Sequence, residues 1–237
     1  MTTKALNEIF TAKAGISSMD RHSMSDMAKH FDALTQYGQD CSVIHELGVR
    51  EIGSSWAFLK GLADRGNAMV TIAEDRKQLE MSPITALISI DHVHPDTFAG
   101  EGTLAEFQKH ARENNVHHEF IESSSLDIEI DNSHCIFFDT DHTYSQLSQE
   151  LQLHGNKSLK YLLFHDTIGC AHEIVPAINE FLEEYPEWIV FDHSLDSEGM
   201  TSLARMSVEQ FDKMKEHQIK SREGEQFKPQ YEDQTND

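Results

Sequence analysis

The stretch CSVIHELGVREIGSSWAFL, residues 41–59, decides the fold. Its first part is an apolar run typical of a strand buried on both faces, and its last part has the apolar spacing of a helix. Gly48 lies between them, where it allows either a tight turn or a close approach of the backbone to a ligand. The free N–H groups at the start of the helix favour an anion. A buried strand followed directly by a helix predicts a parallel α/β sheet.

The rest of the chain repeats this unit. Further β-type runs are ALISID (from Ala86), HHEFIE (from His117), HCIFFD (from His134), LKYLLFHD (from Leu159), EWIVFDH (from Glu187) and TSLARMSV (from Thr201). Helical stretches begin at Ser54, Gly102, Tyr144 and Ala171. This alternation predicts a doubly wound, Rossmann-like α/β fold with right-handed crossovers and a mostly parallel sheet of six to seven strands.

The chain divides into three parts by composition. Residues 1–40 predict a helical cap of two helices within 3–37, the second over MSDMAKHFDAL, and residues 41–210 predict the ligand-binding domain. Residues 211–237 are polar and predict a frayed helix followed by a disordered tail. Residues 66–85 are long for a loop, and MVTIAED within them fits either a strand or a helical extension. We favour an insertion or helical extension.

Charge and cysteine content narrow the partners and the compartment. The chain has 237 residues, with 19 Lys and Arg against 41 Asp and Glu, for a net charge of −22. This charge repels nucleic acid and anionic membrane surfaces. The three cysteines have no CxxC spacing, and no signal peptide or membrane span is evident, so we expect a cytoplasmic protein. A small-molecule partner is expected, and a homo-oligomer stays open.

Several motifs of other enzyme classes are missing from the sequence. The segment GVREIGSS lacks the GxGxxG fingerprint of dinucleotide-binding proteins, and Ile52 stands where a phosphate-binding loop needs a small residue. The sequence contains neither a P-loop nor the Gly-x-Ser-x-Gly elbow of acyl hydrolases. These absences disfavour NAD, FAD, nucleoside triphosphate hydrolysis and acyl transfer.

Polar side chains end several predicted strands, at the sheet edge where such folds bind ligands. Asp91 fits either a ribose diol or a cap for the next segment. Asp139 and His142 follow one strand, and His165 and Asp166 end the next. These oxygen and nitrogen ligands suit a divalent cation with a neighbouring imidazole as a base. Alternatively, they bind a ligand amine, cap a helix and bond to loop backbone.

Five motifs in order then carry a family resemblance: ELGVREIGSSWAFL (46–59), ISIDHVHP (88–95), EFIESSSLDIEI (119–130), FFDTDHTYSQLSQEL (137–151) and KYLLFHDT (160–167). Together they resemble class I S-adenosylmethionine-dependent methyltransferases, in the branch of cephalosporin hydroxylase-like proteins and macrolide sugar O-methyltransferases. The resemblance runs from about Asp20 to about Arg205. It implies the methyltransferase form of the Rossmann-like fold, with ISIDHVHP as the second strand.

The resemblance also implies a set of residues that bind S-adenosylmethionine: Glu46, Gly48, Ser54, Ser55, Asp91, Ser125, Leu126 and Asp139. The loop from Glu46 to Ser55 would surround the methionine part, and Asp91 would hold the ribose hydroxyls. Ser125 and Leu126 would line the adenine. Many relatives carry an acid before that serine, whereas this chain has Ser124, which removes one contact to the adenine amine.

For the acceptor, the resemblance implies Asp139 and His142 as catalytic residues, with His142 as the general base. Asp139, His165 and Asp166 would bind a divalent cation, Mg²⁺ or Mn²⁺. The sugar O-methyltransferases have a Glu-Asp pair where this chain has His165 and Asp166. A nitrogen ligand suits Mn²⁺ or Fe²⁺ better than Mg²⁺, and a site without metal stays open.

The predicted activity is transfer of a methyl group from S-adenosylmethionine to an oxygen of a small polar or sugar-like acceptor. One alternative is a regulatory or assembly protein that keeps the fold and binds the cofactor without methyl transfer. Another is a metal-dependent enzyme that runs a different reaction on the same scaffold.

Overall fold

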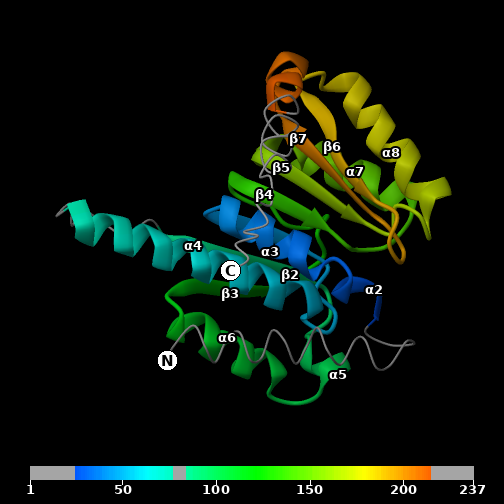
Figure 1. Cartoon of the computed structure of the whole chain (residues 1–237). Helices are drawn as coiled ribbons and strands as arrows, with labels where there is room; N and C mark the ends of the chain where they lie inside the picture. Colours follow the sequence, from blue (N-terminus) through cyan, green and yellow to red (C-terminus); the bar gives the residue numbers. More distant parts are fainter. Residues whose placement is uncertain (1–24, 77–83, 215–237) are drawn as a thin grey trace, which may run out of the picture.

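The computed structural model describes residues 25–76 and 84–214, and it is built on one seven-stranded sheet (Figure 1). The strands are β1 (Val43–Leu47), β2 (Thr85–Asp91), β3 (Val116–Glu122), β4 (Ser133–Phe138), β5 (Ser158–His165), β6 (Trp188–Ser194) and β7 (Met200–Arg205). Their order is β3-β2-β1-β4-β5-β7-β6. Strands β1 to β5 pair in parallel, and β7 runs antiparallel to β5 and β6. The mostly parallel sheet and all its predicted strands are confirmed.

Helices connect the strands and cover the sheet. They are α2 (Ser25–Ala28), α3 (Phe31–Asp40), α4 (Gly53–Arg76), α5 (Asp96–Ala99), α6 (Thr103–Glu113), α7 (Tyr144–His154), the 3₁₀ turn η1 (Gly155–Lys157) and α8 (Ala171–Glu184). Helices α3, α4 and α6 contribute to one hydrophobic core, and α7 and α8 contribute to another. No described helix combines the length and apolar character needed to cross a membrane.

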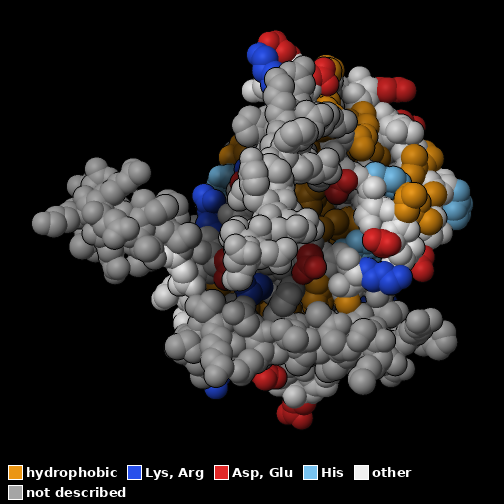
Figure 2. All heavy atoms as spheres, in the orientation of Figure 1, with side chains coloured by type: hydrophobic (Ala, Val, Ile, Leu, Met, Phe, Trp, Pro, Cys, Tyr) orange, Lys and Arg blue, Asp and Glu red, His pale blue; other side chains and the backbone are white. Residues whose placement is uncertain are grey.

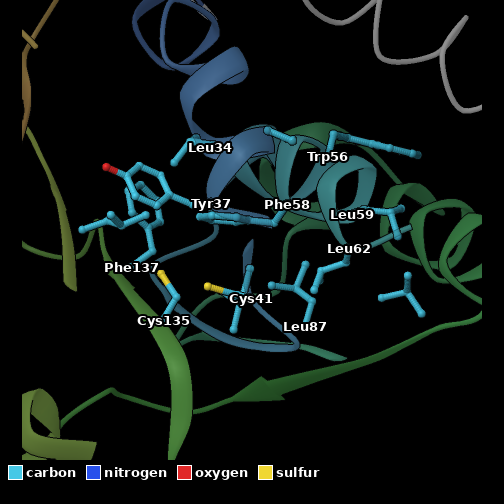
Figure 3. Close-up of a cluster of buried hydrophobic side chains, with 14 of the residues drawn as sticks. Leu34, Tyr37, Cys41, Trp56, Phe58, Leu59, Leu62, Leu87, Cys135 and Phe137 are labelled. Atoms are coloured by element: carbon cyan, nitrogen blue, oxygen red, sulfur yellow. The ribbon is translucent and has the colours of Figure 1, made fainter. Parts of the chain in front are cut away.

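Strand β4 shows how the sequence builds both cores. Cys135 and Phe137 belong to the first core, while Ile136 and Phe138 belong to the second. Successive side chains of a strand point to opposite faces, so a continuous apolar run is required where helices cover both faces. Figure 3 shows the first core, in which Phe58 of α4 packs edge-on against Phe137 with ring centroids 5.5 Å apart.

The first part of the 66–85 segment is helical. MVTIAED lies within α4, which continues to Arg76, so this part of the 66–85 segment is a helical extension and not a strand. Residues 77–83 lie outside the described residues. The first expected N-terminal helix, the cap before residue 25 and the tail beyond residue 214 lie outside them as well; residues 208–214 are helical.

The second N-terminal helix differs from the prediction. The stretch MSDMAKHFDAL was expected as one helix, but α2 ends at Ala28 and α3 begins at Phe31. The break places the buried His30 against the sheet edge, where its ring packs edge-on against that of His165 with centroids 5.5 Å apart. Helix α3 then continues to Asp40, because Tyr37 still adds to the buried face.

Candidate functional site

The loop after β1 brings three strand ends together. Gly48 has a φ of +85°, and its N–H donates to the Ile90 carbonyl at 2.9 Å. The Asp139 N–H donates to the Leu47 carbonyl at 2.8 Å. A Cβ at residue 48 would lie 2.0 Å from the Asp139 carbonyl oxygen. The close approach that the glycine permits is therefore to the backbone of the neighbouring loop.

Asp91 organises the same loop from the end of β2. Its Oδ2 accepts hydrogen bonds from the N–H groups of Val49 (2.8 Å) and Arg50 (3.0 Å). Its Oδ1 accepts from the Val93 N–H at 2.9 Å. Arg50 has a φ of +45°, a backbone conformation that such external hydrogen bonds help to hold. The capping role considered from the sequence is thus present, and the proposed contact with a ribose stays a prediction.

Glu46 forms a polar network beneath this loop. Its fully buried carboxylate accepts from the hydroxyls of Ser54 at 2.5 Å and Ser55 at 2.6 Å. The hydroxyl of Ser89 on β2 donates to it at 2.9 Å. Burial raises the pKa of Glu46 to about 7, against the three hydrogen bonds that stabilise its charged form. The network ties the end of β1 to the start of α4.

A cavity of about 410 Å³ opens beside this loop at the carboxyl edge of the sheet. It lies between the ends of β1, β2, β3 and β4, and its lining includes Gly48, Asp91, Ser125, Asp139, Asp141 and Gln146. This volume is within the usual range for a site that encloses a small organic ligand. The position agrees with the edge where doubly wound sheets bind ligands.

The predicted cofactor residues divide into two groups. Gly48, Asp91, Ser125 and Asp139 line the cavity. Glu46, Ser54, Ser55 and Leu126 are not among the lining residues. The first three of these form the buried network beneath the loop, so in this structure they support the cavity from behind. Their direct contact with a cofactor stays a prediction.

One residue of this region was missed by the sequence analysis. Glu150 of α7 is fully buried and accepts from the hydroxyls of Ser125 at 2.5 Å and Thr140 at 2.8 and 2.9 Å. Gln146, one helical turn earlier, donates to Glu150 at 3.0 Å. Glu150 thereby joins the loop after β3 to the loop after β4. A carboxylate on the apolar face of α7, between Leu147 and Leu151, was a signal for this role.

A second polar group, the acidic–histidine cluster, lies where β4 and β5 end. It consists of Asp139, His142, His165 and Asp166. His142 Nε2 lies 2.8 Å from Asp166 Oδ2 and 3.5 Å from Asp139 Oδ1. His165 Nδ1 lies 2.9 Å from Asp166 Oδ2 and 3.2 Å from Asp139 Oδ1. The prediction that the sheet gathers these four side chains is confirmed.

The side chains of the cluster differ in their exposure to solvent. The side chain of His165 is 3% exposed and that of Asp166 9%, whereas His142 is 39% exposed. Asp166 has a φ of +57°, and its carboxylate lies between His142 and His165. Figure 2 shows acidic and histidine side chains beside hydrophobic ones on the side toward which β4 and β5 point in Figure 1. His142 is the most exposed member of the cluster.

The carboxylates determine the protonation of the histidines. Hydrogen bonds to Asp139 and Asp166 raise the pKa of His142 to about 10. They also raise the pKa of His165 to about 10, although burial alone would lower it. The two histidines in turn hold the pKa of Asp166 well below its usual range, against the effect of burial. The carboxylates therefore favour the charged form of both histidines.

The cluster has a donor set that a divalent cation could use. One ligand atom from each of Asp139, His142 and Asp166 lies within 4.8 Å of the others. Two carboxylate oxygens and one imidazole nitrogen fit Mn²⁺ or Fe²⁺ better than a site that demands only oxygen. In this arrangement His165 Nδ1 bonds to the two carboxylates, so His165 would orient the ligands from behind. The predicted ligand set of Asp139, His165 and Asp166 stays a prediction, and His165 Nδ1 also lies within 3.2 Å of both carboxylates.

Comparison with known proteins agrees with the architecture. No protein-family model and no curated protein matches the chain. Among solved structures, a protein from Corynebacterium glutamicum is similar, with 13% identity, 84% of this chain and 90% of that chain covered, and a TM-score of 0.55. Cofactor-bound Rv0187 from MTB is similar over 86% of this chain and 91% of its own, with 12% identity and a TM-score of 0.54.

A third similar structure is the methyltransferase PaMTH1 from Podospora anserina bound to S-adenosylhomocysteine. It covers 84% of this chain and 88% of its own, with 12% identity and a TM-score of 0.51. The chain therefore has the Rossmann-like fold of class I methyltransferases, as the sequence resemblance implied.

Proposed function

We propose that the protein transfers a methyl group from S-adenosylmethionine to an oxygen of a small polar or sugar-like acceptor. The observation that carries this proposal is the position of Asp139, which lines the cavity and also belongs to the acidic–histidine cluster. One side chain thus borders both a space for a donor and a set of groups that can handle a proton. An in-line methyl transfer needs this adjacency, because the sulfonium methyl and the acceptor oxygen must meet.

The cavity would hold the donor. The proposed arrangement puts the methionine part beside Gly48 and Asp139, the ribose near Asp91 and the adenine near Ser125. Gly48 and Asp91 keep the loop after β1 folded back, so the cavity is open without rearrangement of that loop. A preformed cavity lowers the entropy cost of binding.

The acidic–histidine cluster would handle the acceptor. His142 is exposed enough to reach an acceptor hydroxyl, but its carboxylate partners keep it protonated. It can accept a proton only when these partners are engaged elsewhere. A divalent cation bound by Asp139 and Asp166 would lower the pKa of an acceptor hydroxyl. It would also compete with His142 for the carboxylates, and His142, as long as it does not itself bind the cation, would then be free to act as a base.

The setting we propose is the reducing cytoplasm. Cys41, Cys135 and Cys170 are all free thiols, and two of them are buried in the core. Free buried thiols are typical of proteins that fold in a reducing compartment.

A thermal-shift titration tests the donor assignment. S-adenosylmethionine or S-adenosylhomocysteine at about 100 times its dissociation constant should stabilise the protein by about 2.7 kcal/mol. For a chain of this size, this corresponds to an increase in Tm of about 5–11 °C. NAD should produce no shift, because the loop after β1 lacks the dinucleotide fingerprint. No shift with S-adenosylmethionine, or an equal shift with NAD, would refute the proposal.

A further inference from the structure

The side-chain amide of Gln146 has a fixed orientation at the cavity wall. Its Nε2 donates both to Ser125 Oγ and to Glu150 Oε1, each at 3.0 Å. Because the amide nitrogen is used on the helix side, the amide oxygen Oε1 is the acceptor left for another partner. Gln146 is half-buried and lines the cavity. The wall thus offers a neutral hydrogen-bond acceptor at a defined place.

Glu150 determines which way the Gln146 side-chain amide is turned. The Glu150 carboxylate accepts here from the hydroxyls of Ser125 and Thr140, so its oxygens act as acceptors in this network. A Gln146 amide turned by 180° would point its oxygen at Glu150, where two acceptors would face each other. The flipped amide is therefore disfavoured by the loss of a hydrogen bond and by repulsion between oxygens.

The serines of the same wall are already engaged. The Ser124 hydroxyl accepts from the Leu126 N–H at 3.2 Å, and the Ser123 hydroxyl donates to the Ser124 carbonyl at 3.2 Å. The Ser125 hydroxyl belongs to the Glu150 network. The side chains of this wall that still offer acceptors include the Gln146 amide and the exposed Asp141 carboxylate. Of these two, the hydrogen bonds described above hold only Gln146 in one orientation.

We propose that Gln146 Oε1 accepts a hydrogen bond from the exocyclic amine of the adenine, and that Glu150 is the positioning residue that holds it there. This inference rests on the proposed function. It assigns base selection to the first turn of α7 and not to the loop after β3. A site built to accept from an amine discriminates against a base that carries a carbonyl at the same position, because two acceptors then face each other.

Calorimetric titration with two ligands tests the proposal. The probes are S-adenosylhomocysteine and S-inosylhomocysteine, which differ in having an amine or a carbonyl at that position of the base. The parent protein should bind the adenine ligand about tenfold or more tightly than the hypoxanthine ligand. Gln146→Met keeps the length of the side chain but removes the acceptor. It should weaken binding of the adenine ligand about tenfold and leave the hypoxanthine ligand within about threefold.

Two further variants make the result specific. Asp141→Leu is the matched control on the same wall, because it removes the other acceptor, and it should leave the ratio of the two affinities unchanged. Glu150→Met should reduce the ratio as Gln146→Met does, and the double variant should reduce it no further, because both changes remove one oriented acceptor. If Glu150→Met does not fold, the result for Gln146→Met decides.

The outcomes separate this inference from the proposed function. If the parent binds neither ligand, the cofactor assignment fails. If the parent binds S-adenosylhomocysteine but Gln146→Met keeps the full ratio of affinities, the inference is overturned. It is equally overturned if Asp141→Leu abolishes the ratio.

Discussion

Replacing Gly48 by alanine should damage both stability and the site. Gly48 has a φ of +85°, and a Cβ there would lie 2.0 Å from the carbonyl oxygen and 2.5 Å from the carbonyl carbon of Asp139. Both obstacles are backbone atoms of a loop that is hydrogen-bonded to β1, so they cannot rotate away as a side chain would. The loop that carries Asp139 must move.

Gly102 supplies the matched control for the size of this effect. Its φ is +86°, but nothing lies within 4 Å of the position that a Cβ would take. Gly102→Ala should therefore cost only the left-handed backbone conformation, about 1–2 kcal/mol. Gly48→Ala should cost the same plus about 1–3 kcal/mol for the forced displacement. The difference between the two variants isolates the contact with Asp139.

Thermal and denaturant unfolding measure the difference. At about 2–4 °C per kcal/mol, Gly102→Ala should lower the Tm by about 2–8 °C and Gly48→Ala by about 4–20 °C. Gly48→Ala should also weaken binding of S-adenosylhomocysteine, since both the cavity and the acidic–histidine cluster include Asp139. Equal Tm values for the two variants, with unchanged ligand binding by Gly48→Ala, would refute the reasoning.

Two other predictions concern charged groups of the site. The folded pKa of Glu46, about 7, lies above the ordinary value of 4.5, so folded protein binds more protons between these values and loses stability as the pH rises through them. Glu46→Gln should remove this loss. Between pH 5 and pH 8, the free energy of unfolding of the parent should therefore fall by up to about 3 kcal/mol more than that of the variant. Parallel pH profiles of the two proteins would contradict this prediction. His142→Ala should lower the methyl-transfer rate about 10²- to 10⁴-fold with cofactor affinity nearly unchanged, whereas Asp166→Ala should also abolish any stabilisation by Mn²⁺. If His142→Ala turns over at the parent rate, His142 is not the base. If a chelator changes neither the turnover nor the stability of the parent protein, the proposed metal site is wrong.

The cluster at the ends of β4 and β5 shows how far residue positions can be predicted. The apolar runs in the sequence predict β4 and β5. In a parallel sheet the ends of these strands meet, so Asp139 and Asp166 must lie at the same edge. The identity of their contacts was not predictable. Asp166 has a φ of +57°, and its Oδ2 lies 2.8 Å from His142 Nε2 and 2.9 Å from His165 Nδ1. Such a local backbone conformation leaves no periodic signal in the sequence.

The sequence by itself determined the sheet, the order of the main helices and strands, and the edge of the sheet at which the cavity opens. These follow from apolar periodicity and from connection rules that act along the chain. Only the tertiary structure decided that Glu46 supports the cavity from behind and that Glu150 joins two loops through Ser125 and Thr140. The helix break that brings His30 to His165 was decided in the same way. The physical reason is that a buried polar side chain takes its partners from whatever packing brings near, across separations that no local pattern records.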